Sequence, residues 1–140
     1  MNISNHTHAN SILTFGYGNR KEYRELLDYV EQFHVNYVVD VRLKPRAWSR
    51  KWYGDSLEKL CKSMNIQYIS EKSLGNTSNS NHWTPPDENE AEKSLADISL
   101  LIHNGSILLL CAEMDSSKCH RVEVAHKLQE LTGASVKHLK

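Results

Sequence analysis

The chain has 140 residues, 39% of them hydrophobic, and its 17 basic residues balance 17 acidic ones. This length suits one domain with a hydrophobic core of its own, and the neutral sum excludes a polycation of the histone type. The sequence has no apolar run of about 18 residues, so it predicts no membrane-spanning helix.

The polar composition of residues 1–10 predicts a flexible tail rather than a signal peptide, and residues 11–140 are expected to form a single domain. Three cysteines, an odd number without a secretion signal, argue against a disulfide framework. We therefore expect a cytoplasmic protein with free thiols and no membrane association.

Apolar runs alternate with helical patterns through the first half of the chain. Ser11–Tyr17 predicts a buried strand that ends at glycines. Asn19 and Glu22 have the spacing of a capping box, so a helix is expected from there to about Phe33. The remaining predictions are a strand over Tyr37–Val41, a basic and aromatic loop over Leu43–Gly54, a helix capped near Asp55 that runs to Met64, and a strand over Ile66–Ile69.

The second half continues the same alternation after a long polar loop over Leu74–Glu90. A helix over Glu90–His103 should stop at an Asn-Gly pair, and Ile107–Cys111 is the strongest strand because every residue in it is apolar. Ser117 is expected to cap a last helix that ends at Gly133, and Val136–Leu139 is a possible fifth strand.

This order predicts an α/β fold in three layers, a mainly parallel sheet of about five strands with helices on both faces. Such sheets bind ligands at the carboxyl ends of their strands. Polar groups follow four of the predicted strands, so distant segments should converge on one edge of the sheet.

Four arginines near these strand ends are candidates for binding an anion, because guanidinium pairs bidentately with phosphate. Glycine amides could approach the same anion, and Asp40 is expected mainly to orient its neighbour Arg42. The predicted substrate-binding set is Gly16, Tyr17, Arg20, Asp40, Arg42, Arg50 and Arg121.

Three further residues are candidates for catalysis. Glu113 follows an apolar strand and could transfer a proton, while Cys119 and His120 lie at the start of the last predicted helix. A helix N-terminus favours thiolate, which suits a nucleophile or a sulfur carrier, although packing is an equally good interpretation of Cys119.

Cys111 and Cys119 do not fit a cysteine-phosphatase site or a structural zinc site. Cysteine phosphatases have arginine six positions after cysteine, and neither Cys111 nor Cys119 has one there. Cys111 and Cys119 are not spaced as the C-x₂-C pairs of structural zinc sites. An adjacent cysteine and histidine on a helix also seldom bind the same metal ion. We therefore assign no metal site and no cofactor, although the cysteine and histidine residues leave a metal site open as a disfavoured alternative.

Residues 42–52 hold five basic residues and two tryptophans. Basic groups contact phosphates and aromatic faces stack on unpaired bases, so this segment is an alternative binding surface for nucleic acid. Its candidate residues are Arg46, Trp48, Arg50, Lys51 and Trp52. A solvated loop anchored by its tryptophans explains the same pattern equally well.

Four motifs lie within a stretch of about residues 13–139. They comprise Thr14, Gly16, Tyr17 and Arg20; then Asp40-Val41-Arg42, Pro45 and Ser49-Arg50; then Tyr68 and Leu74-Gly75; then Leu110-Cys111, Glu113, Asp115 and Cys119-His120-Arg121. In these motifs the chain resembles the family catalogued as domain of unknown function 488. The resemblance implies an α/β fold and a shared polar site, but it names no reaction.

Three functions are compatible with these residues. The first is an enzyme that acts on a phosphate-bearing substrate, a nucleotide or nucleic-acid component, held by Arg20, Arg42 and Arg121. The second is a noncatalytic nucleic-acid-binding module that uses residues 42–52, and the third is a sulfur or redox carrier that uses Cys119. We expect the partner to be a phosphate-bearing small molecule or a nucleic acid.

Overall fold

A computed structural model describes residues 10–78, 82–113 and 119–140. Five strands form one sheet in the order β3-β2-β4-β1-β5, and every neighbouring pair is parallel. The strands are β1 (Ser11–Gly16), β2 (Val35–Asp40), β3 (Gln67–Ser70), β4 (Ser106–Cys111) and β5 (Ser135–His138). The predicted α/β class and three-layer arrangement are confirmed.

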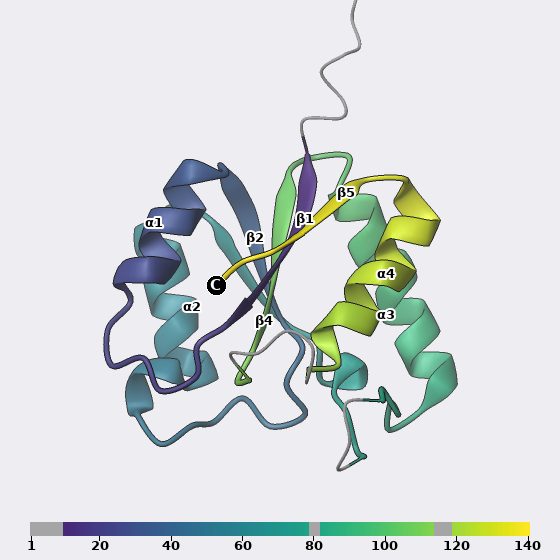
Figure 1. Cartoon of the computed structure of the whole chain (residues 1–140), viewed down its shortest axis with the longest axis horizontal. Coiled ribbons are helices and arrows are strands. Elements are labelled where there is room, and N and C mark those ends of the chain that lie inside the picture. Colours follow the sequence, from purple (N-terminus) through teal and green to yellow (C-terminus); the bar gives the residue numbers. More distant parts are fainter. Residues whose placement is uncertain (1–9, 79–81, 114–118) are drawn as a thin grey trace, which may run out of the picture.

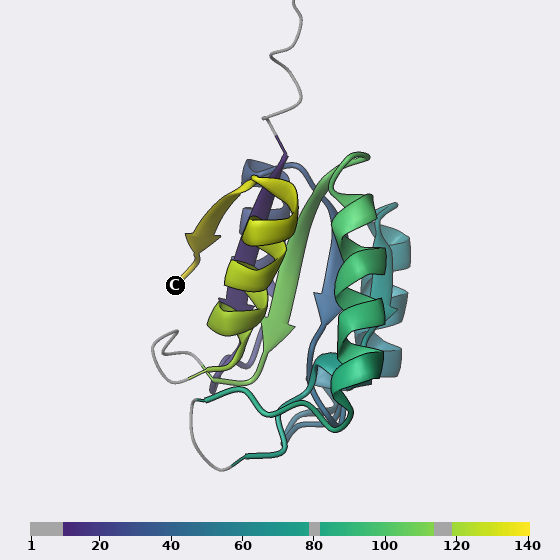
Figure 2. The same cartoon turned by 90° about the vertical axis from the view of Figure 1, so that its right-hand side faces the viewer.

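Four α-helices cover the two faces of the sheet (Figures 1 and 2). They are α1 (Arg24–Gln32) and α2 (Gly54–Ser63) on one face, and α3 (Glu88–Leu101) and α4 (Arg121–Thr132) on the other. Two short 3₁₀ helices, η2 (Arg50–Trp52) and η3 (Lys72–Leu74), lie in the connections after β2 and β3. No described helix is long and apolar enough to cross a membrane.

The central strands β1, β2 and β4 are buried on both faces of the sheet because they carry apolar residues at successive positions. In β4, Ile107 and Leu109 pack beneath α3 and α4, whereas Leu108 and Leu110 pack beneath α1 and α2. Side chains alternate between the faces of a strand, so the central strands β1, β2 and β4 each contribute to two separate cores. The last residue of β4, Cys111, belongs to the α3/α4 side.

The predicted capping box after β1 is wrong. Helix α1 begins later, at Arg24, and its N-cap Tyr23 makes no side-chain hydrogen bond. The backbone carbonyl of Arg20 instead accepts a hydrogen bond from the indole of Trp52. The segment between β1 and α1 is therefore held by a tertiary contact that the local pattern does not show.

Two other helix starts differ from the sequence patterns. Helix α2 begins at Gly54, so Asp55 lies in its first turn and not at its N-cap. Helix α3 begins at Glu88, because the Asp87 carboxylate accepts a hydrogen bond from the backbone N–H of Glu90. The predicted tail and the predicted cap Ser117 lie largely or wholly outside the described residues.

The long segment before α3 is fixed at its second half by Trp83, which is buried on the α3/α4 side. Its indole N–H donates to the carbonyl of Gly75 at 3.0 Å, and its backbone N–H donates to the Glu123 carboxylate at 2.7 Å. These bonds connect the segment to the loop after β3 and to α4.

Candidate functional site

The carboxyl ends of β1, β2 and β4 lie side by side, as the parallel sheet predicts. Gly16 is in register with Cys111, and Asp40 is in register with Leu110. The side chains at these ends do not all face the same way, however. Asp40 and Tyr17 belong to the α1/α2 side, whereas Cys111 faces α3 and α4.

On the α1/α2 side, Asp40 and Arg42 form a buried bidentate ion pair. Arg42 donates from Nε to Oδ1 of Asp40 at 2.8 Å and from Nη2 to Oδ2 at 2.6 Å. Tyr68 donates to the same Oδ2 at 2.5 Å. Burial alone would lower the pKa of Arg42, but the hydrogen bond and the negative charge of Asp40 raise it above its usual value.

An aromatic stack continues from this ion pair. The Arg42 guanidinium lies 5.4 Å from the ring centroid of Tyr17, and Arg42 Nη1 donates to the Tyr17 hydroxyl. Tyr17 in turn stacks on Trp52, with centroids 4.9 Å apart and rings within 9° of parallel. Burial raises the pKa of Tyr17, opposed by the hydrogen bond and charge of Arg42. The stack joins β1 to the loop that follows β2.

A cleft of about 920 Å³ opens beside this stack, and we call it the rim cleft. The loop after β1, the loop after β2 and the end of β4 enclose it. Its lining residues are Tyr17, Gly18, Asn19, Arg20, Lys21, Ala47, Trp48, Ser49, Trp52, Ala112 and Glu113. Trp48 is fully exposed, while Trp52 is 1% exposed and forms part of the wall.

Gly16 allows the ends of β1 and β4 to approach closely. A Cβ added at this position would overlap with the carbonyl oxygen of Glu113. The same carbonyl accepts a hydrogen bond from the guanidinium of Arg121, whose side chain is fully buried. Arg121 therefore holds the turn after β4 from inside the protein.

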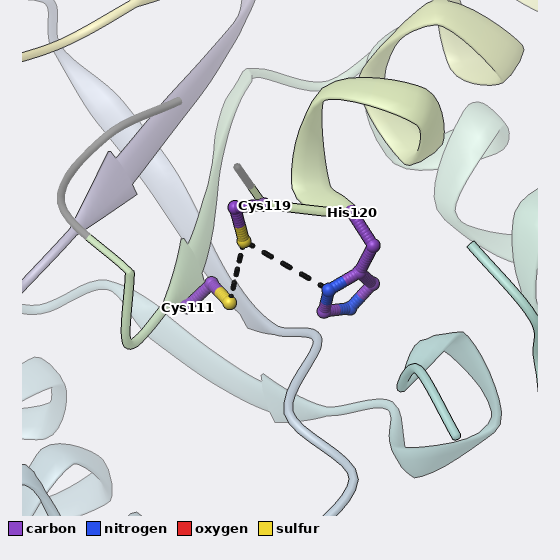
Figure 3. A group of neighbouring side chains, drawn as sticks. All are labelled: Cys111, Cys119 and His120. Carbon is purple, nitrogen blue, oxygen red and sulfur yellow. Dashed lines mark hydrogen bonds between the residues drawn. The ribbon is translucent and has the colours of Figure 1, made fainter. Parts of the chain in front are cut away.

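On the opposite face, Cys111, Cys119 and His120 form a compact group (Figure 3). The Cys119 thiol donates to Cys111 Sγ at 2.7 Å, and Cys119 Sγ lies 3.8 Å from His120 Nδ1. This hydrogen bond lowers the pKa of the Cys111 thiol to about 7, despite burial. The same bond, with burial, raises the pKa of Cys119 to about 12. The acidic thiol of the pair is thus Cys111.

The profile of the family described as Domain of unknown function DUF488 matches residues 22–128, most of the chain. The chain belongs to the DUF488 family. Comparisons with the curated proteins and with the solved structures found no match. The segments Asp40-Val41-Arg42 and Cys119-His120-Arg121 fall inside the matched range, whereas Gly16 and Tyr17 precede it.

The fold of this DUF488 domain brings part of the predicted substrate-binding and catalytic set together. Tyr17, Arg20 and Glu113 line the rim cleft. Asp40, Arg42 and Arg121 are buried and contact protein groups, and the Arg50 guanidinium lies 5.1 Å from the ring centroid of Tyr53. Cys119 and His120 belong to the separate group behind the sheet. The carrier hypothesis for Cys119 stays a prediction.

The alternative surface over residues 42–52 is also divided. Lys44, Arg46, Trp48 and Arg50 are exposed at every second position of the chain. Trp52 is buried, and the Lys51 ammonium pairs with Glu22 at 2.5 Å. The two tryptophans, which the sequence presents as equivalent, therefore have different surroundings.

The sequence interpretation missed Asn19, Lys21 and Ser49 as lining residues of the rim cleft. Asn19 and Lys21 directly follow the first strand, so the rule that ligands bind at strand ends could have included them. No sequence signal marks Ser49, because its place beside the cleft depends on tertiary contacts. In the structure its hydroxyl accepts a hydrogen bond from the backbone N–H of Lys51.

Proposed function

We propose that the protein is an enzyme that binds a nucleotide or a nucleic-acid component in the rim cleft. The observation that carries this proposal is the combination of one exposed indole, two cationic side chains and one carboxylate around a single cleft. These groups belong to Trp48, Arg20, Lys21 and Glu113. The cleft volume of about 920 Å³ falls within the range of small-molecule sites, about 300–1,000 Å³.

Each group has a role that its chemistry suits. Arg20 and Lys21 would bind the phosphate, and Trp48 would stack on the base, an interaction that tolerates any base because every base has a π-face. Glu113 would move a proton to or from the reacting group. Two contacts orient the Arg20 side chain. Its guanidinium lies 4.9 Å from the ring centroid of Phe15, and its Nη1 lies 3.6 Å from the carboxylate of Glu25.

Arg42 and Arg121 enter this proposal as positioning residues and not as direct ligands of the phosphate. Arg42 supports Tyr17, and Arg121 supports the turn that carries Glu113. Cys119 and His120 are left out, because they are buried on the other face of the sheet. We place the activity in the cytosol, where the three thiols would remain reduced.

The test is calorimetric titration with nucleoside mono-, di- and triphosphates and with inorganic phosphate. Arg20→Gln should weaken nucleotide binding about tenfold or more, because hydrogen bonds to charged groups contribute about 1.5–3 kcal/mol. Trp48→Ala should weaken nucleotide but not phosphate binding. Arg24→Gln is the matched control, because Arg24 is exposed nearby but does not line the cleft. Absence of binding, or equal binding by all variants, would contradict the proposal.

Glu113→Gln separates binding from chemistry. The amide keeps the shape of the side chain but cannot accept a proton at neutral pH, so nucleotide affinity should stay close to that of the unmodified chain. Turnover of the bound ligand, followed by chromatography of the products, should fall about 10²–10⁴-fold. A variant that binds and turns over as before would exclude Glu113 as the acid or base.

A second candidate function, noncatalytic nucleic-acid binding, is favoured by the alternate exposure of Lys44, Arg46, Trp48 and Arg50. A segment with three cations and one indole on its outer side suits a single strand, with phosphates and bases contacted in turn. Anisotropy titrations of a fluorescent single-stranded oligonucleotide at increasing salt test it. Arg46→Gln should lower the salt slope by about 1. Binding of mononucleotides alone, without a salt-dependent oligonucleotide complex, would reject this candidate.

A further inference from the structure

We propose that Cys111, Cys119 and His120 bind one thiophilic metal ion, Zn²⁺ or Cu⁺, behind the sheet. One ligand atom from each residue lies within 4.8 Å of the others, so one small ion could reach all three after minor adjustment. Cys111 ends β4, and the other two residues immediately precede α4 (Figure 3). His120 is the N-cap of α4 and has helical dihedral angles, with φ −62° and ψ −15°, whereas Cys119 precedes it. The two adjacent side chains nevertheless converge, because Cys119 Sγ lies 3.8 Å from His120 Nδ1.

The orientation of His120 is the second observation. Its Nε2 lies 2.9 Å from the carbonyl oxygen of Val41. A carbonyl oxygen only accepts hydrogen bonds, so Nε2 carries the proton in this contact. In the neutral ring Nδ1 then has a free lone pair, and Nδ1 is the nitrogen that lies beside the Cys119 sulfur. A backbone carbonyl that holds the far nitrogen of a histidine is the usual outer partner of a metal-binding imidazole.

The surroundings of the two sulfurs also suit an ion. All three residues are buried, with 7%, 5% and 7% of Cys111, Cys119 and His120 exposed, and apolar side chains of α3, α4 and the sheet surround the cysteines. Burying one thiolate here is costly, but two thiolates and a divalent cation sum to zero charge. Cys119 Sγ also accepts a hydrogen bond from the backbone N–H of Arg121 at 3.5 Å.

The donor set determines the kind of ion. Two thiolates and one imidazole select soft or borderline metals, and they disfavour Mg²⁺ and Ca²⁺, which take oxygen ligands. Zn²⁺ would complete its tetrahedron with a fourth ligand from outside the residues that the structure describes, whereas Cu⁺ is satisfied by fewer ligands. Cys111 faces α3 and α4, whereas Tyr17 and Trp52 of the rim cleft face α1 and α2. The two sites meet only at the turn after β4, where Ala112 and Glu113 line the cleft.

The test uses the full chain, reduced and stripped of metal, titrated with Zn²⁺ against a chromophoric chelator and separately with Cu⁺ against a Cu⁺-specific chelator. We expect one ion per chain in at least one arm. Cys119→Ser and His120→Gln should lower the affinity about tenfold or more, since loss of even an outer partner costs about 10–100-fold. Cys61→Ser is the matched control, because Cys61 is equally buried but lies in α2 on the other face.

A second measurement does not depend on the folding of variants. The unmodified chain is alkylated with and without metal after mild denaturation, and each cysteine is quantified by mass spectrometry. Metal should protect Cys111 and Cys119 but not Cys61. No stoichiometric binding in either arm, equal protection of all three cysteines, or binding unchanged by Cys119→Ser and His120→Gln would overturn the proposal. Formation of a Cys111–Cys119 disulfide in a chain that binds no metal when reduced would also overturn it.

Discussion

Arg42 contacts Asp40, two residues before it, through two hydrogen bonds that join the guanidinium to both oxygens of the carboxylate. Both side chains are buried, with 5% of Arg42 and none of Asp40 exposed. The backbone N–H of Arg42 also donates to Asp40 Oδ1 at 3.1 Å. The pair therefore fixes the backbone at the end of β2 and places the Arg42 guanidinium beside the Tyr17 hydroxyl.

Asp40→Ala should destabilise the protein by about 3–5 kcal/mol, because it leaves the Arg42 guanidinium buried without its anion. Urea unfolding followed by circular dichroism measures the change. Glu22→Ala is the matched control, since the Glu22–Lys51 pair is just as short but exposed, and it should cost about 1 kcal/mol or less. A similar decrease in the free energy of unfolding in the two variants would show that the buried ion pair contributes no more to stability than the exposed one.

The two tryptophans of the loop after β2 should respond in opposite ways to truncation. Trp52→Ala removes the ring on which Tyr17 stacks and should cost about 3–5 kcal/mol. Trp48→Ala removes an exposed side chain and should change stability by about 0.5 kcal/mol or less. Thermal and urea unfolding of both variants test this. A destabilised Trp48→Ala would mean that its indole is buried against the protein in solution.

Gly16→Ala should destabilise the protein by about 1–3 kcal/mol through overpacking, because the new Cβ meets the Glu113 carbonyl. Gly133 is the useful comparison. It has a φ of +75° and open space around it, so Gly133→Ala should cost about 1–2 kcal/mol through backbone strain alone.

Asparagine distinguishes these two causes. Gly133→Asn should be less harmful than Gly133→Ala, because asparagine tolerates the left-handed conformation. Gly16→Asn should be more harmful than Gly16→Ala, because its side chain is larger. The reverse order at either glycine, measured by urea unfolding, would contradict the assigned cause.

His138 should make the stability of the protein depend on pH. Its Nδ1 lies 2.8 Å from the hydroxyl oxygen of Thr14. Burial, followed by the charges of His126 and Arg121, lowers the pKa of His138 from 6.5. The unfolded chain therefore binds this proton more readily than the folded protein. The contribution to stability is present above pH 6.5 and is lost as the pH falls below that value.

The melting temperature, measured between pH 8 and pH 5, tests this linkage. The unmodified chain should lose more stability across the range than His138→Gln, which cannot take up the proton. The comparison between the two proteins removes the contribution of the other histidines. If the melting temperatures of the two proteins change with pH in the same way, His138 has the same pKa in the folded and unfolded states.

The strand and helix pattern predicted most of the fold, but not the chemistry of the sheet edge. Ile107–Cys111 is apolar throughout, so its buried strand follows from the sequence alone. The start of α1 does not, because the hydrogen bond from Trp52 to Arg20 joins segments 32 residues apart. Local spacing carries no information on such a contact.

The sequence by itself determined the α/β class, a mainly parallel sheet of short apolar strands and the set of polar residues at the strand ends. It also favoured a structural role for Asp40, orienting Arg42 or a loop, although it kept Asp40 in the substrate-binding set. These features depend on local periodicity and on short separations along the chain, which physical rules relate directly to structure.

Only the tertiary structure decided which of those residues share a site. The alternation of side chains sends Tyr17 and Cys111 to opposite faces of one sheet edge, and long-range packing buries Trp52 while it leaves Trp48 exposed. Long-range packing also brings Cys119 and His120 beside Cys111, although the spacing of these residues in the sequence does not match a metal-binding motif. The reason is physical: strand register and loop packing are set by the whole core, and they determine which polar groups meet.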